Sequence, residues 1–144
     1  MDLIKFQQNC QSFDAWEILV PIIEKHFNDL IDLTQFQLSE GETGNGAMPD
    51  YASEEYAHIK QQYVSTYKIY PTVDLRVTGD FYRGMKARIV LMGIEIESID
   101  SKAAKLESKY SLKIYVLNDK NLETFINMIV DEFIEAIYKK LAKE

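Results

Sequence analysis

Four acidic side chains in the second half of the chain have types and spacing that could bind a divalent metal ion. They are Asp80, Glu95, Glu97 and Asp100. Residues two apart on a β-strand project to the same face, so Glu95 and Glu97 could share one cation through carboxylate oxygens. A metal-dependent nuclease of the restriction-enzyme kind would carry a lysine at the position of Glu97. A metal-dependent hydrolase or nuclease therefore stays an alternative, and we favour the solvated face of an amphipathic strand.

The other residue types that commonly carry chemistry lack suitable partners. The Gly-rich segment 39–50 follows no apolar strand and precedes no Lys-Ser or Lys-Thr pair, unlike a phosphate-binding loop. His26 and His58 have no partner at metal-ligand spacing, which favours surface or boundary positions. Cys10 is expected to act as a small apolar side chain. We therefore predict no catalytic residue, no cofactor and no metal site.

Length and composition indicate one globular domain over residues 1–144. The chain is 47% hydrophobic and 27% charged, an ordinary globular balance. A net charge of −7 argues against a protein that grips nucleic-acid phosphates, because that affinity needs cations. The single cysteine excludes an internal disulfide. No apolar run suits a membrane helix and no signal peptide is recognisable, so we expect an intracellular protein or part of a particle assembled inside a cell.

Hydrophobic periodicity predicts an α+β fold, in which a small antiparallel β-sheet packs against a long N-terminal helix and a long C-terminal helix. The first helix should cover residues 14–33, starting at the cap residue Asp14. Pro21 should kink this helix, or else mark a later helix start at Val20. The last should cover residues 122–141, with Asn118 and Asn121 as candidate caps. Both patterns place apolar residues three and four positions apart.

The middle of the chain predicts shorter elements. Residues 39–50 should form a flexible loop with no buried face, and Ser53 should cap a helix. Thr78 should cap a second, short helix that carries Phe81, Tyr82 and Met85. The remaining expected elements are a β-hairpin of strands 86–92 and 94–99 around Gly93, a helix over 101–110, and a strand over 113–117 in which Ile114 and Val116 share one side.

Tyrosines and arginines in the middle of the chain favour contact with other proteins. Tyrosine is enriched where a surface is buried against a partner. The basic cluster of Arg76, Arg83, Lys86 and Arg88 in an acidic chain suits an acidic partner surface. The alternatives are that the tyrosines line the domain's own core edge and that the cations are solvated. The predicted interaction residues are Tyr51, Tyr56, Tyr63, Arg76, Tyr82, Arg83 and Arg88.

The order of several short motifs resembles the tail-completion, or virion-morphogenesis, family of tailed phages and prophages. The motifs are Gln35-Phe36-Gln37-Leu38, a Gly-rich turn, Met48-Pro49-Asp50-Tyr51, Glu55-Tyr56-Ala57 with Lys60, and Asp74 to Tyr82, which contains the structural motif Thr78-Gly79-Asp80-Phe81. In that family a Leu-x-x-Thr-Gly signature precedes a β-hairpin and a closing C-terminal helix.

The resemblance implies a structural protein of the head–tail junction, assembled in the bacterial cytoplasm and catalysing nothing. Its partners would be other copies of itself in a ring, portal, neck or tail proteins, and double-stranded DNA only as cargo in the channel, with no membrane. An acidic channel lining would repel DNA phosphates. A small cytosolic adaptor that binds a host protein is a further alternative.

Overall fold

The computed structural model describes residues 2–63, 73–75, 79–91 and 93–143. The helices are α1 (Leu3–Gln11), α2 (Ala15–Lys25), α3 (Phe27–Ser39), α4 (Glu54–Tyr63), α5 (Asp80–Arg83), α6 (Ala103–Tyr110), the 3₁₀ helix η1 (Leu112–Tyr115) and α7 (Asp119–Leu141). The strands are β1 (Glu42–Thr43), β2 (Gly46–Ala47), β3 (Met85–Val90) and β4 (Gly93–Ser98). They form two separate antiparallel pairs, β1–β2 and β3–β4, so the predicted α+β class is confirmed.

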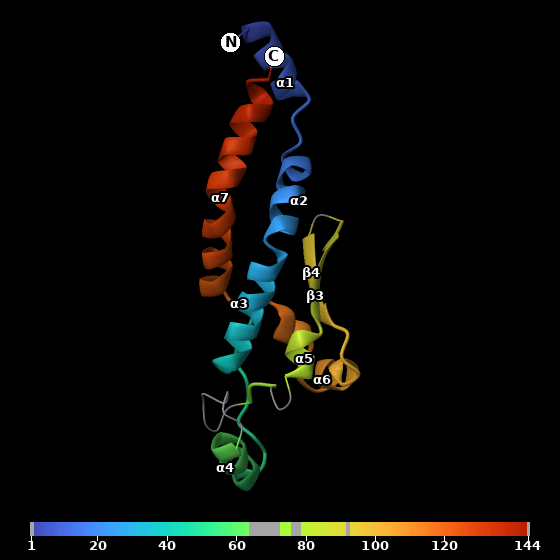
Figure 1. Cartoon of the computed structure of the whole chain (residues 1–144), viewed down its shortest axis with the longest axis vertical. Helices are drawn as coiled ribbons and strands as arrows, with labels where there is room; N and C mark the ends of the chain where they lie inside the picture. Colours follow the sequence, from blue (N-terminus) through green and yellow to red (C-terminus); the bar gives the residue numbers. More distant parts are fainter. Residues whose placement is uncertain (1, 64–72, 76–78, 92, 144) are drawn as a thin grey trace.

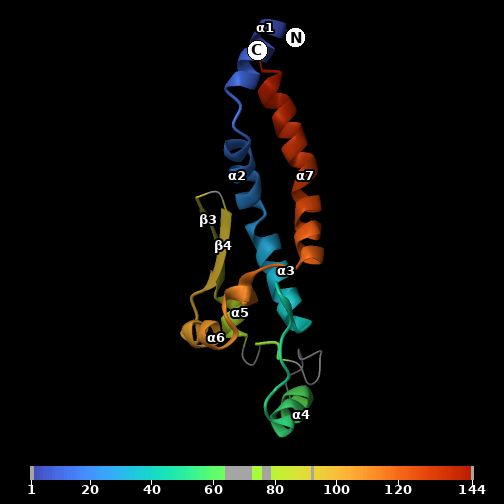
Figure 2. The same ribbon diagram turned by 180° about the vertical axis from the view of Figure 1, so that it is seen from behind.

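The molecule is long and narrow. Helices α1, α2 and α3 follow one another along its length, and α7 returns beside them, which brings both termini to one end (Figure 1). The β3–β4 hairpin lies on the other side of α2 from α7, and α4 forms the far end of the molecule (Figures 1 and 2). Helix α2 contacts both α7 and β3, so it is the central element of this arrangement.

Side-chain caps start the two helices that the sequence predicted most clearly. The Asp14 carboxylate accepts hydrogen bonds from the amides of Trp16 at 3.0 Å and Glu17 at 3.4 Å, at the start of α2. The Asn118 side chain accepts one from the Asn121 amide at 2.9 Å, at the start of α7. Each cap satisfies amides that have no partner inside the helix, so the predicted caps Asp14 and Asn118 are confirmed. The other candidate, Asn121, lies inside α7 and is not a cap.

The prediction of one continuous helix over residues 14–33 was wrong, because the chain breaks at His26. Pro21 lies inside α2, with its ring exposed, where one lost hydrogen bond is compatible with the helix. At His26 the backbone leaves helical geometry, with φ −104° and ψ 17°. Its ring lies 2.8 Å from an Asp29 carboxylate oxygen and 2.9 Å from one of Glu132, so this break is fastened to α7.

The His26 contacts predict a pH-dependent stability. Hydrogen bonds that the His26 ring donates to the carboxylates of Glu132 and, to a lesser extent, Asp29 raise the pKa of His26 above its ordinary value of 6.5. Because the pKa of His26 is higher in the folded state, the protonated ring stabilises the fold fully below pH 6.5. This stabilisation disappears as the pH rises through the raised pKa. His26→Gln should therefore cost more stability near pH 6 than near pH 9, as checked by urea unfolding at both values. An equal cost at both would contradict a charged His26.

The segment over residues 39–50 is packed, contrary to the prediction of a loop without a buried face. Thr43 and Met48 are buried, and the Thr43 hydroxyl donates to the Gly46 carbonyl at 2.8 Å. The amide of Gly44 donates to the Lys113 carbonyl at 3.2 Å. A Cβ atom on Gly44 would lie 2.7 Å from the Val116 side chain and 2.9 Å from its carbonyl oxygen. A glycine is required there because the backbones meet closely.

Gly44→Ala should lower the free energy of unfolding by about 1–3 kcal/mol, because the added methyl group overpacks against a backbone carbonyl. Gly93→Ala is a matched control, since the nearest atom to its Cβ would be the Val90 carbonyl oxygen at an ordinary 3.7 Å. Urea unfolding of both variants measures the difference. Equal stabilities would show that the β1–β2 hairpin shifts to admit the methyl group.

The predicted hairpin is confirmed as β3–β4, with Met85 opposite Ser98. Gly93, expected between the strands, is instead the first residue of β4 and pairs with Val90. Ile96 is buried between exposed Glu95 and half-buried Glu97, which agrees with the predicted alternation. Met85 begins β3, so its predicted place on the preceding helix was wrong. The predicted helices after Ser53 and over residues 101–110 are confirmed as α4 and α6.

Two local features around α5 and η1 differ from expectation. The residue that caps α5 is Gly79, at φ +86°, a conformation that favours glycine; Thr78 lies outside the described residues. Residues 113–117 do not form a strand, because Ser111 at φ +67° starts the 3₁₀ turn η1. As a result Ile114 is buried and Val116 is exposed, instead of sharing one side.

A buried glutamine joins α3 to the start of α7. The Gln37 side-chain amide donates to the Val116 carbonyl at 2.8 Å, and its oxygen accepts from the Asn118 amide at 2.8 Å and the Asn121 side chain at 3.1 Å. Leu38, next to it, is fully buried in the core. This glutamine fixes where η1 ends and α7 begins, a role that sequence reasoning missed.

Candidate interaction surfaces

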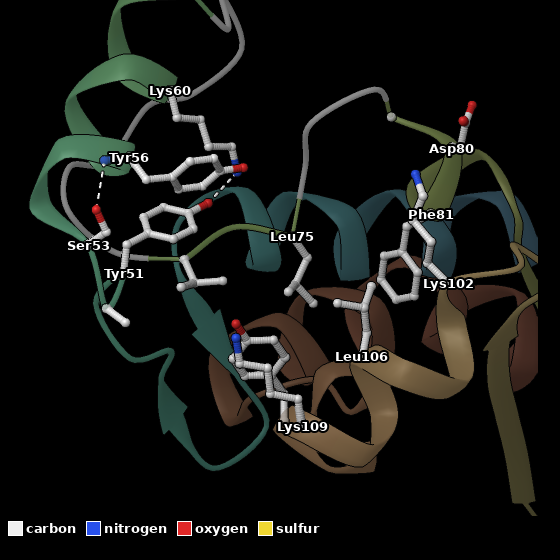
Figure 3. Close-up of a pocket in the computed structure, with 14 residues that line it drawn as sticks. Tyr51, Ser53, Tyr56, Lys60, Leu75, Asp80, Phe81, Lys102, Leu106 and Lys109 are labelled. Carbon is white, nitrogen blue, oxygen red and sulfur yellow. Dashed lines mark hydrogen bonds between the residues drawn. The ribbon is translucent and has the colours of Figure 1, made fainter.

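A pocket of about 440 Å³ lies between α4, α5 and α6. Its lining is mainly apolar and aromatic, with lysines at several points (Figure 3). It brings together predicted residues that are far apart in the sequence, because Tyr51 and Tyr56 line it together with Gly79, Asp80 and Phe81. The other described lining residues are Ala52, Ser53, Lys60, Val73, Leu75, Lys102, Leu106, Lys109 and Tyr110.

A buried ion pair lies beside the pocket, where one of its partners, Lys60, is a lining residue. The Lys60 ammonium group bonds the Asp74 carboxylate and the Tyr51 hydroxyl, and both charged side chains are almost inaccessible, at 2% and 0% exposure. Burial lowers the pKa of Lys60, and the Asp74 carboxylate opposes this effect. The Tyr82 hydroxyl donates to the Asp74 carbonyl at 2.5 Å. These bonds fasten α4 to the segment before α5.

The predicted interaction tyrosines have different environments. Tyr51 and Tyr56 pack edge to face, with ring centroids 5.2 Å apart, and Tyr56 is exposed. Tyr82 is buried at 3% exposure, so assigning it to a contact surface was wrong. Its ring packs against Phe81 in the core. The side chain of Tyr63 falls outside the described part of the structure, although its backbone belongs to α4.

The predicted basic cluster is dispersed. Arg83 bonds Asp80 on α5, while the Arg88 guanidinium donates to Glu95 at 3.1 Å across the hairpin. The hydrogen bond and charge of Glu95 raise the pKa of Arg88. Arg76 lies outside the described residues. The two described arginines are therefore paired within the chain and lie on different elements.

Three of the four candidate metal-binding acids each bond a different group of the chain. Asp80 bonds Arg83, Glu95 bonds Arg88, and the Asp100 carboxylate accepts from the Lys102 amide at 3.2 Å. Over residues 2–63, 73–75, 79–91 and 93–143, no three His, Cys, Asp or Glu side chains gather closely enough to hold a metal ion. The described residues thus offer no cluster for the hydrolase alternative.

Helix α7 carries two adjacent apolar rows. The inner row, Phe125 and Ile129, is buried against α2 and α3 and continues the line of the buried polar residue Asn121. The outer row, which we call the α7 ridge, repeats every fourth residue. All of its side chains are exposed except that of the central residue, Val130, which is half-buried. The α7 ridge consists of Leu122, Ile126, Val130, Ile134 and Tyr138. Ridges of this i±4 kind are what helices pack into one another's grooves.

Sequence reasoning missed both the α7 ridge and the lysines of the pocket. Among the residues that the structure describes, no helix is both long and apolar enough to cross a membrane. Comparison of the chain with models of protein families, with curated proteins and with solved structures gives no match.

Proposed function

We propose that the chain is a structural subunit of the head–tail junction of a tailed phage or prophage, where it acts by assembling into a ring with other copies of itself. The ring subunit binds portal, neck or tail proteins, surrounds DNA as cargo and catalyses no reaction. The order of motifs from Gln35 to Phe81 supports the family, and the α7 ridge supports assembly.

The observation that carries the proposal is the α7 ridge. Ile126 and Ile134 are each 47% exposed and Tyr138 is 71% exposed, on a helix whose inner row already packs against the core. In an isolated chain these side chains would leave apolar surface in water, which is unfavourable by roughly 25 cal/mol per Å². Contiguous exposed apolar surface of this kind marks sites of protein association.

The arrangement of the elements suits head-to-tail packing. A ring requires two different, complementary surfaces on each subunit. The α7 ridge supplies one of them, and the β3–β4 hairpin lies on the other side of α2 from helix α7 (Figure 2). Among the described residues, only Leu122 of the ridge, at its start, lines a hollow with Ile94 and Ile96 of β4. Leu91 in the hairpin turn is 95% exposed, the highest exposure among the large hydrophobic side chains of the described residues. We therefore place the α7 ridge of one copy against the hairpin side of the next.

Particle composition tests the proposed location. Virions produced by a host that carries this gene are purified on a density gradient and analysed by mass spectrometry for peptides of this chain. We expect the chain in the particles, in several copies for each portal ring. Its absence from intact particles, combined with recovery on a single host protein, would contradict the virion role and favour the adaptor alternative.

A further inference from the structure

The charged groups of the pocket leave it positive in an otherwise acidic chain. Two of its charged residues have partners of opposite charge within the chain, because Lys60 bonds Asp74 in the interior and Asp80 bonds Arg83 at the surface. Lys102 and Lys109 also line the pocket. Neither has a carboxylate within ion-pair distance among the described residues, although the chain carries 23 Asp and Glu residues against 16 Lys and Arg.

The spacing of these two lysines defines the size of a matching ligand. Lys102 precedes the first turn of α6 and Lys109 lies in its last turn, with Leu106 between them (Figure 3). Seven residues of helix separate the two lysine backbones by about 10 Å along the axis. A helical segment with two anionic groups seven residues apart can therefore place one group at each ammonium.

The surface between the lysines is apolar. Leu106, Leu75 and Phe81 lie in the hollow, and the Tyr110 ring lies under the Lys109 ammonium group at 5.2 Å. The volume of about 440 Å³ falls within the ordinary range of ligand pockets, about 300–1,000 Å³. The ligand thus has an apolar centre between its two charges. Nucleic acid does not fit this description, because its phosphates are not separated by an exposed apolar body.

We propose that this pocket binds an acidic amphipathic peptide segment of a partner protein, with apolar side chains in the hollow and two carboxylates on Lys102 and Lys109. A helical segment with acids seven residues apart and leucines between them has the same period as α6 and matches it in charge and shape. The site is separate from the α7 ridge. It rests on the proposed function only in that the partner would be another subunit of the particle.

A designed peptide tests the pocket directly. The probe is an Ala-rich helical peptide of about 16 residues, with two glutamates seven residues apart and two leucines between them. Its binding to the full chain is measured by isothermal titration calorimetry, beside a peptide in which both glutamates are lysines. We expect the glutamate peptide to bind and the lysine peptide to bind at least about tenfold more weakly.

Charge reversal in the protein completes the test. Lys102→Glu/Lys109→Glu should lower the affinity for the glutamate peptide about tenfold or more and raise the affinity for the lysine peptide. Lys86→Glu/Lys120→Glu makes the same change in net charge at exposed lysines outside the pocket and should leave both affinities nearly unchanged. Equal binding of the two peptides, no binding of the glutamate peptide at millimolar concentration, or an equal loss in the control variant would overturn the proposal.

The same variants separate this inference from the proposed function. If the pocket is wrong and assembly is right, Lys102→Glu/Lys109→Glu forms the same oligomer as the original chain and no peptide binds. If assembly is wrong and the pocket is right, the chain remains a monomer and still discriminates between the two peptides.

Discussion

Lys60→Met is expected to lower the free energy of unfolding by about 3–5 kcal/mol, the largest effect of any single substitution considered for this chain. Asp74 is fully buried, and the substitution removes the positive charge that Lys60 places beside its carboxylate. A carboxylate in a low-dielectric interior is costly without a nearby cation. Urea unfolding followed by circular dichroism measures the change.

A second variant shows whether the loss comes from the stranded charge or from altered packing. Lys60→Met/Asp74→Leu removes both charges and should recover most of the stability, because buried ion pairs are often replaceable by apolar residues. Lys105→Met removes an exposed lysine of α6 and should change stability by less than about 0.5 kcal/mol. If Lys60→Met lowered the free energy of unfolding by less than about 1 kcal/mol, this would contradict the inference that the ion pair fastens α4 to the segment before α5.

Ile126→Glu/Ile134→Glu is expected to convert the assembled protein into folded monomers. The two side chains lie in the middle of the α7 ridge and are half-exposed in the single chain, so charge there is tolerated by the fold. In an interface the same carboxylates would be buried without partners, at a cost of several kcal/mol. The mass in solution, measured by light scattering after size-exclusion chromatography, reports the change.

The matched control places two glutamates on another exposed part of the same helix. Thr124 and Met128 are exposed, and Met128 lies about 200° around the helix from Ile126. Thr124→Glu/Met128→Glu should keep the oligomer. If this control dissociated as completely as the ridge variant, the effect would come from added negative charge and not from the α7 ridge.

Local signals predicted those parts of the fold that depend on nearby residues. The Asn118 cap, the periodicity of α7 and the alternation of Ile94 to Glu97 act within a few residues, and all agree with the structure. Residues 113–117 were misassigned, because β-branched side chains favoured a strand while Ser111 starts a 3₁₀ turn. Propensity is a weak prior that backbone context overrides.

The features that sequence analysis did not predict depend on contacts between residues far apart in the chain. The break at His26 involves Glu132 on α7, and the packed β1–β2 hairpin depends on Val116. The pocket lies where Lys60 of α4 bonds Asp74, fourteen residues further along the chain. None of these pairings leaves a pattern in one sequence. The α7 ridge did leave one, since apolar residues on this helix are too many for the single face that contacts the core.

The concentration dependence of the mass in solution tests the assembly of this chain most directly. Sedimentation velocity of the purified full-length protein, from micromolar to several hundred micromolar at physiological salt, should show one discrete oligomer that Ile126→Glu/Ile134→Glu dissociates. A chain that sediments as a monomer over the whole concentration range would contradict the proposed assembly, because the α7 ridge would then stay exposed to solvent.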